Sequence, residues 1–410
     1  MSQTFWFNII LILLVLNFLF TSILEFINDK SWKDKIPDSL KDFYTKKNYK
    51  KAKNYKMENS RISLISSIIS FLITLLILIS GFYGYLSDYL ISLSNSEFIQ
   101  SSMFFLFFFF INTLISIPVK YYSTFIIEEK YGFNKSSIKL FFIDQIKGLI
   151  MSILVGGILL FCAINLYQIF SNGFWVWLWI GLSIFIIFLN VFYASLIVPI
   201  FNKLTPLENG KLKEKIEDYS KKIGYSLKNI FIIDGSKRSS KANAFFSGLG
   251  PKKTIALFDT LIENHSDEEL LAVLAHEVGH YKKNHVLKGL FLSILQVGLM
   301  CYLFELCSLQ NQISYALGAE IPAFHLGLIG FSLLYSPIGL ITGILMNILS
   351  RKNEFEADNF AKKTYDGKHL SLALKKLSSD NLSNLYPHPF YVFIHYSHPP
   401  LIKRLNALSS

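Results

Sequence analysis

The stretch Leu270-Leu-Ala-Val-Leu-Ala-His276-Glu277-Val-Gly-His280-Tyr281 places two histidines four residues apart in a largely apolar run. At 3.6 residues per turn both imidazoles lie on one face of a helix, about one turn apart, and can bind one metal ion. Glu277 lies about 100° further around the helix, too far to join the pair as a ligand. It is well placed to take a proton from water on the metal. The pattern predicts one zinc ion per chain with a general base beside it.

Ser266 and Glu269 precede this run with the S-x-x-E spacing of a capping box, which satisfies free amides at a helix start. We therefore expect the helix to begin near Asp267. The alternative is a surface helix that carries two chance histidines. The capping box and the scarcity of histidine, nine in 410 residues, favour the metal site.

A catalytic zinc site needs a third protein ligand and one position left for water. In the stretch 351–361, Glu354 and Asp358 are four residues apart and share a helix face, whereas Glu356 points elsewhere. Glu354 is the candidate ligand, and Asp358 would hold the far N–H of a ligating histidine. The alternative is an ordinary exposed helix face with an acidic pair.

Two further segments contain candidate substrate-binding groups. Asn243 begins Asn-Ala-Phe-Phe-Ser-Gly248 in a polar loop, and a strand edge beside a zinc helix can bind an extended peptide by main-chain pairing. His398 precedes two prolines and is followed by Arg404, which would suit donors aimed at an oxyanion. Composition alone leaves a solvated histidine in a Pro-rich loop equally acceptable.

The composition is that of a polytopic membrane protein, with 52% hydrophobic and only 17% charged residues and a mean hydropathy of +0.39. We expect seven membrane helices. Their apolar segments cover about 5–27, 62–86, 102–119, 148–169, 174–200, 286–307 and 324–349.

Basic residues indicate the orientation. Loops 28–61 and 120–147 contain 11 and 5 Lys and Arg residues, whereas 87–101, 170–173 and 308–323 contain none. By the positive-inside tendency the N-terminus lies outside and the catalytic region is cytoplasmic. The net charge of +11 then reflects the membrane topology and attraction to anionic lipid heads, and we expect no nucleic-acid partner.

The three cysteines, Cys162, Cys301 and Cys307, lie in apolar segments. We expect them to be buried hydrophobic residues rather than disulfides or zinc ligands.

The main soluble region is predicted at 207–285. Residues 211–222 have the pattern of a charged amphipathic helix, and 229–234 and 253–258 that of short strands joined by a polar loop. These two strands are expected to form a small β-hairpin or edge pair beside the zinc helix. The fold class is thus mainly α, with a zincin-like catalytic region.

Seven blocks in order resemble one family, the type I CAAX prenyl endopeptidases, which are integral-membrane zinc metalloproteases. The blocks lie at residues 127–134, 199–207, 235–245, 257–261, 274–280, 354–358 and 395–400. Lys241 departs from the family pattern, which has His or Ser at that position.

The resemblance implies seven helices around a water-filled chamber and endoproteolysis after a prenylated cysteine, with removal of the last three residues. It implies zinc at His276, His280 and Glu354 and a catalytic base at Glu277. Asn243, His398 and Arg404 would hold the substrate backbone or the oxyanion, and Asp358 matches the acid behind a ligand. Expected partners are a peptide or protein substrate, with or without a C-terminal prenyl group, and the lipid bilayer. We divide the chain into a membrane region at 1–200 and a metallopeptidase region at 201–410.

Two other functions compete with this interpretation. One is a general quality-control metalloprotease of the membrane. The other is a non-catalytic transporter, lipid-handling protein or scaffold, which has no need of a base such as Glu277.

The compact chain and its bias toward Ile, Lys, Asn and Phe favour a bacterial plasma membrane over the endoplasmic reticulum.

Overall fold

The computed structural model describes residues 2–170, 172–224, 229–247 and 254–409, and most of them are helical. The helices of the N-terminal half are α1 (Gln3–Lys30), α2 (Lys46–Ile79), α3 (Phe82–Leu93), α4 (Glu97–Tyr122), α5 (Glu129–Tyr131), α6 (Ile138–Phe170), α7 (Phe174–Phe192) and α8 (Val198–Phe201). Those of the C-terminal half are α9 (Lys211–Lys222), α10 (Asp259–Asn264), α11 (Asp267–Lys282), α12 (His285–Ser308), α13 (Asn311–Ala316), α14 (Phe324–Leu334), α15 (Ser336–Thr364), α16 (Gly367–Asp380), α17 (Pro389–His395) and α18 (Leu401–Ser409). Single π-helical turns at Ser123–Glu128 and Tyr193–Ile197 follow α4 and α7.

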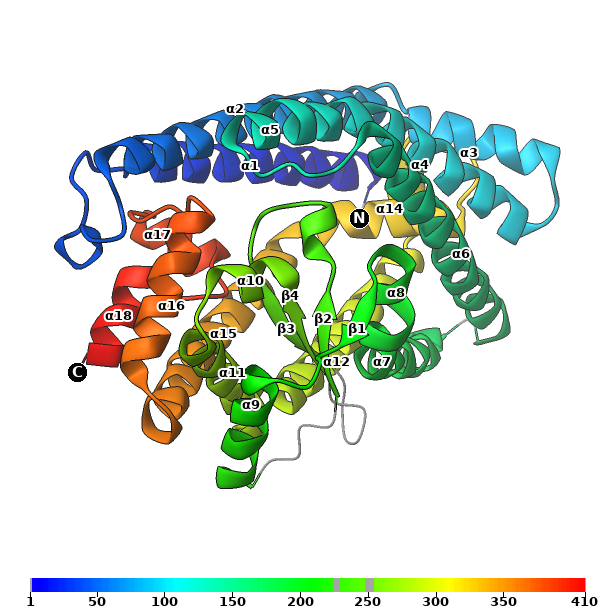
Figure 1. Ribbon diagram of the computed structural model, residues 1–410. Coiled ribbons are helices and arrows are strands. Elements are labelled where there is room, and N and C mark those ends of the chain that lie inside the picture. The colour runs from blue at the N-terminus through cyan, green and yellow to red at the C-terminus, as the bar shows by residue number, and fades with distance from the viewer. Residues whose placement is uncertain (1, 171, 225–228, 248–253, 410) are drawn as a thin grey trace.

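Six helices are long and apolar enough to cross a membrane, and a seventh span results if the bent pair α14 and α15 is counted as one. The pair bends by 55° at its break. All seven predicted apolar segments therefore lie on such helices. The second ends earlier than expected, because Gly81 adopts a left-handed φ of 66° and separates α2 from α3. Figure 1 shows α1 and α2 side by side along one edge of the molecule.

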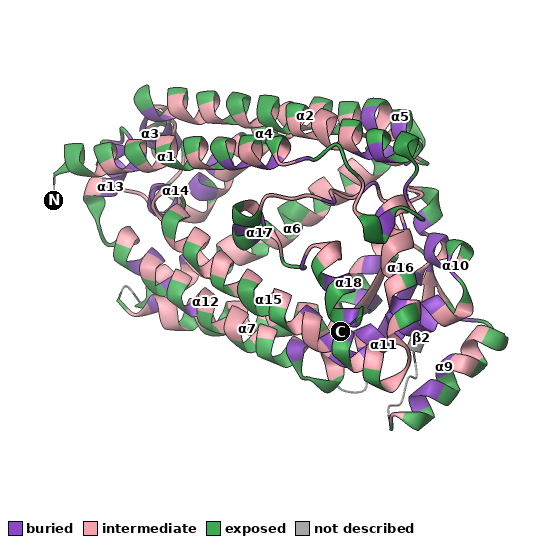
Figure 2. Cartoon of the chain, turned by 90° about the vertical axis from the view of Figure 1, so that its left-hand side faces the viewer, coloured by how far each residue is buried: buried purple, intermediate pink, exposed green. Residues whose placement is uncertain are grey.

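The exposed faces of the long helices are apolar. Ile12, Leu16 and Ile23 of α1 are each more than half exposed, as expected of side chains that meet lipid. Figure 2 shows that fully buried residues are sparse along α1 and α2 and gather around α10, α11 and β2. Of the three cysteines, Cys301 is buried, Cys307 is intermediate and Cys162 is exposed, so burial was wrongly predicted for Cys162.

The β structure differs from the predicted hairpin. Four strands, β1 (Leu204–Pro206), β2 (Asn229–Ile233), β3 (Ala244–Ser247) and β4 (Thr254–Phe258), form a mixed sheet in the order β1-β2-β4-β3. The two strands expected to form the hairpin, β2 and β4, are neighbours but run parallel. The loop between them supplies β3, which pairs antiparallel with the far side of β4. Lys253, predicted as the first residue of the last strand, lies outside the described residues.

The sheet packs against the helix that carries the histidines. Ile230 and Leu257 of the sheet share one buried cluster with Leu270 and Leu274 of α11 and with Ala361 of α15. The strand β3 lies at the edge of the sheet, and its residues Ala244 and Phe245 line one pocket with His276 and Glu277 of α11. The predicted amphipathic helix at 211–222 is confirmed as α9, which contributes Ile216 to the same core.

Candidate metal centre

Helix α11 begins where its capping box predicts. Ser266 Oγ accepts a hydrogen bond from the Glu269 amide, and the Glu269 carboxylate accepts one from the Ser266 amide. The first helical residue is Asp267. Almost every residue from Glu269 to Gly279 is buried, so the two histidines are presented from a fixed helix in the protein interior.

A close approach of α11 and α15 brings the third candidate ligand to the histidines. A Cβ atom on Gly279 would lie 3.1 Å from both Cα and the carbonyl oxygen of Ala357. The small pair Gly279 and Ala357 thus lets the two backbones come together. His276 and His280 on one helix then face Glu354 and Asp358 on the other.

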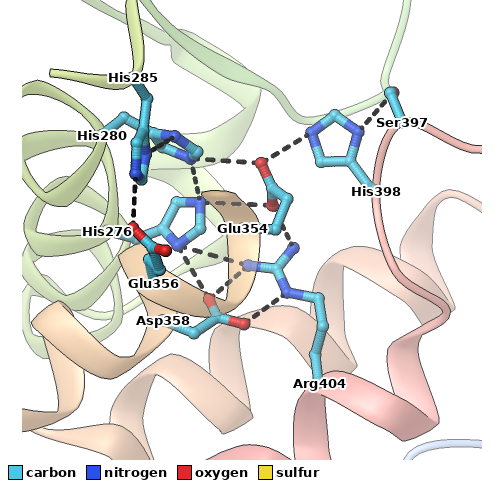
Figure 3. A network of polar contacts seen from close by, with 9 residues as sticks. All are labelled: His276, His280, His285, Glu354, Glu356, Asp358, Ser397, His398 and Arg404. Atoms are coloured by element: carbon cyan, nitrogen blue, oxygen red, sulfur yellow. Dashed lines mark hydrogen bonds and ion pairs between the residues drawn. The ribbon is translucent and has the colours of Figure 1, made fainter. Parts of the chain in front are cut away.

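Three side chains converge on one point. The Nε2 atoms of His276 and His280 are 3.1 Å apart, and the Glu354 carboxylate lies 3.6 Å and 3.2 Å from them. One donor atom from each residue lies within 4.8 Å of the others. Figure 3 shows the three groups facing one another from two helices. Two imidazoles and a carboxylate are a donor set that suits a catalytic divalent metal.

Glu354 provides an independent test of the fit. Its Oε2 atom is buried and has no hydrogen-bond partner among the described residues, although Arg404 Nη1 lies 3.3 Å away in an ion pair. Arg404 provides an ion pair but no hydrogen bond, so among the described residues no donor occupies this oxygen and it can bind a metal ion. The residues at this site therefore fit a bound metal ion.

Asp358 and Arg404 stand behind the ligands. Asp358 Oδ1 lies 2.8 Å from Nδ1 of His276, which fixes the ring with its other nitrogen toward Glu354. Arg404 donates to both oxygens of Asp358, at 2.6 Å and 2.8 Å. Burial alone would lower the pKa of Arg404, but these bonds and the nearby carboxylates raise it, so the guanidinium stays charged.

Sequence reasoning missed a second supporting arm. The Nδ1 atom of His280 lies 3.1 Å from Nδ1 of His285, and His285 Nε2 lies 3.1 Å from Glu356. Glu356 thus points away from the histidine pair, as expected, but toward the far side of His280. His285 lies five residues after His280, at the start of the next helix, and this spacing could have indicated the contact between them.

The pKa of His280 depends on its burial and on its contact with Glu354. Burial alone would lower the pKa of His280, but its hydrogen bond with Glu354 and the charge of that carboxylate outweigh burial and raise it. A metal ion bound here would therefore compete with a proton for this imidazole.

The remaining predicted residues surround a pocket of about 430 Å³ in front of the ligands. Glu277, Asn243 and His398 all line it. His398 Nε2 lies 3.4 Å from Glu354, and its side chain is 65% exposed. Arg404 also borders the pocket, but its guanidinium is occupied by Asp358 and Glu354. The structure thus brings all eight predicted site residues to one place.

Comparison with known proteins identifies the family. Residues 206–410 match peptidase family M48, and residues 27–203 match the domain described as CAAX prenyl protease N-terminal, five membrane helices. This chain belongs to peptidase family M48. The predicted resemblance to the CAAX prenyl endopeptidases is thereby confirmed, and this M48 protein is a membrane metalloendopeptidase of the CAAX-processing type.

Individual relatives cover nearly the whole M48 chain. CAAX prenyl protease 1 of Saccharomyces cerevisiae is 34% identical over 91% of this chain and 88% of its own. The CAAX prenyl protease 1 homolog of Homo sapiens is 33% identical over 92% of this chain and 89% of its own. The crystal structure of S. mikatae Ste24p superposes with a TM-score of 0.93 at 32% identity and covers 99% of both chains.

Proposed function

We propose that this protein is a zinc-dependent protease that removes the last three residues of proteins carrying a prenylated cysteine. The observation that carries the proposal is the meeting of two histidines and one glutamate from two different helices. In the described part of the chain, one oxygen of this glutamate accepts no hydrogen bond. The names of the relatives supply the substrate class.

In this proposal His276, His280 and Glu354 bind the zinc ion. Zinc, when bound, supplies a Lewis acid that polarises the scissile carbonyl and lowers the pKa of water. Glu277 lines the pocket next to the ligands without being one of them. It takes the proton of the attacking water and passes it to the leaving amine, a role that needs one carboxylate with open access to the pocket.

The other groups act on the substrate or on the ligands. Asn243, at the start of the edge strand β3, holds the substrate backbone, and the exposed His398 donates to the oxyanion. Arg404 is a positioning residue, because its guanidinium is engaged with Asp358 and Glu354 rather than free to reach the substrate. Asp358 orients His276.

The placement of the chain follows from the basic loops. We propose that residues 1–200 form the membrane region, with the N-terminus outside, and that the metallopeptidase region 201–410 lies on the cytoplasmic side. The bacterial plasma membrane stays a prediction from composition, and the curated relatives compared above are both eukaryotic. The substrate is a peptide or protein, met at the bilayer.

Cleavage of two fluorogenic peptides by the purified protein in detergent tests the proposal. One peptide carries a farnesyl-cysteine followed by three residues, and the other is its unlipidated twin. We expect chelator to stop cleavage and Glu277→Gln to abolish it with zinc still bound, whereas Glu263→Gln, on an exposed face of α10, serves as the matched control. Faster cleavage of the farnesylated peptide supports prenyl-protein processing. Equal cleavage would indicate general membrane proteolysis, and zinc binding without cleavage would refute the proposal.

A further inference from the structure

A second, polar pocket is lined by the segment that leads into β3, and the same segment continues into the pocket of the metal site. It has a volume of about 360 Å³ and is lined by the end of α4, the π-helical turn after it, the start of α6 and residues 238–241. Lys241 lines this pocket, and the next residue, Ala242, lines the pocket of the metal site. The two pockets are therefore adjacent along the chain.

The pocket has one basic group more than it has carboxylates. Its charged side chains are Lys120, Arg238, Lys241, Glu128 and Asp144. Two of the basic groups are paired: Lys241 Nζ lies 3.0 Å from Glu128, and Arg238 binds Asp144 through Nε and Nη2 at 2.7 Å and 2.9 Å. The pocket is thus suited to a ligand with a single negative charge.

Two donors remain for such a ligand. Arg238 Nη1 is buried and has no hydrogen-bond partner in the part of the chain that the structure describes. Asp144 holds the other two nitrogens of this guanidinium, so its orientation is fixed before any ligand binds. Lys120 contacts only the neutral Gln145 amide oxygen, at 3.3 Å, and forms no ion pair with a described carboxylate.

The edge strand indicates which anion reaches this pocket. Asn243 O accepts a hydrogen bond from the Phe258 amide, so the main-chain groups of the next residue, Ala244, point to the free edge. A peptide that pairs antiparallel with β3 runs from Ser247 toward Asn243. Asn243, Ala244 and Phe245 line the pocket that contains Glu277, so a scissile bond in this pocket can lie at its Asn243 end. The residues after the scissile bond then continue past Ala242 toward Lys241.

Length agrees with this path. Three extended residues span about 10 Å, and the two residues from Asn243 to Lys241 span at most about 7 Å. A chain that ends three residues after the cut therefore places its terminus near the polar pocket. We propose that Lys120 and Arg238 bind the C-terminal carboxylate of the substrate. This subsite would select peptides that end three residues after the cleavage site, and it rests on the function proposed above.

The test compares two farnesylated fluorogenic peptides that differ only in a C-terminal carboxylate or carboxamide. Charge-assisted hydrogen bonds to the carboxylate should make kcat/KM about ten- to hundredfold higher for the acid. Lys120→Gln should reduce this acid-to-amide ratio to about three- to tenfold, because it removes one of the two donors and about half of the free energy that they supply. Lys139→Gln, an equally exposed lysine on α6 outside the pocket, should keep the ratio of the unmodified protein.

Binding separates failure of this subsite from failure of the proposed function. The same two peptides are titrated against zinc-loaded Glu277→Gln protein by fluorescence anisotropy, which needs no turnover. Tighter binding of the acid, reduced in the Lys120→Gln background, supports the subsite. Zinc-dependent cleavage of acid and amide at equal rates, or equal binding of both, overturns the subsite and leaves the peptidase intact. Absence of cleavage of either peptide overturns the proposed function instead, and the anisotropy ratio then decides the subsite.

Discussion

Replacing Asp358 with Asn tests the idea that the ligands are held from behind. The change keeps the size of the side chain but removes its charge and one of the two acceptor oxygens. Asp358 is 1% exposed, and it contacts His276 at 2.8 Å and Arg404 at 2.6 Å and 2.8 Å. Loss of such a buried partner of a metal ligand weakens metal binding about 10- to 100-fold, which is about 1.4 to 2.8 kcal/mol.

The second arm gives a matched control on the same helix. Glu356 supports His280 through His285 at 3.1 Å, but its side chain is 37% exposed. Partly exposed ion pairs contribute at most about 1 kcal/mol, so Glu356→Gln should weaken zinc binding no more than about fivefold. Zinc affinity is measured by competition with a fluorescent chelator at fixed pH. Equal losses in the two variants, or an Asp358→Asn affinity within twofold of the unmodified protein, would refute the reasoning.

Three further outcomes are expected. Zinc affinity should fall as the pH drops through the raised pKa of His280 and stay constant above it, because zinc binds only the neutral imidazole; a titration that is flat between pH 5 and 8 would contradict the pairing with Glu354. His398→Gln should lower kcat about 100-fold with zinc stoichiometry retained, as measured by cleavage assays and metal analysis, and a loss of zinc instead would make His398 a ligand. Gly84→Ala should lower the thermal unfolding temperature markedly, since the new Cβ would lie 2.0 Å from backbone atoms of Gly318 and cost about 3 kcal/mol or more; an unchanged unfolding temperature would argue against this contact.

Most of the correct predictions rested on residues that are close together in the sequence. The capping box at Ser266 and Glu269 fixed the start of α11, since its two hydrogen bonds join residues three apart. The membrane helices could also be predicted from the sequence, because an apolar segment of about 20 residues is recognisable without knowledge of its packing partners. The i, i+4 spacing of Glu354 and Asp358 placed both carboxylates on one face, and the structure turns that face to His276.

Features that depend on distant partners were harder to predict. The parallel direction of β2 and β4 cannot be predicted from either strand alone, because β3 lies between them in the sequence and pairs with the far side of β4. The tetrapeptide of β3 is too short for a periodic pattern and becomes a strand only through its pairing with β4. The contact of His285 with His280 needs the turn at Asn284, whose φ of 57° folds α12 back toward the end of α11.

The approach of α11 to α15 explains why the residue before His280 is as informative as the histidines. A side chain at Gly279 would meet the backbone of Ala357 at 3.1 Å and push the helices apart. A shift of even 1 Å would separate Glu354 from both imidazoles and Asp358 from the ring it orients, since all these contacts cross the same helix interface. The small residues Gly279 and Ala357 thus permit the close helix approach at which Glu354 lies beside the two histidines. The candidate metal centre therefore depends on both helices, because the two histidines come from α11 and Glu354 comes from α15.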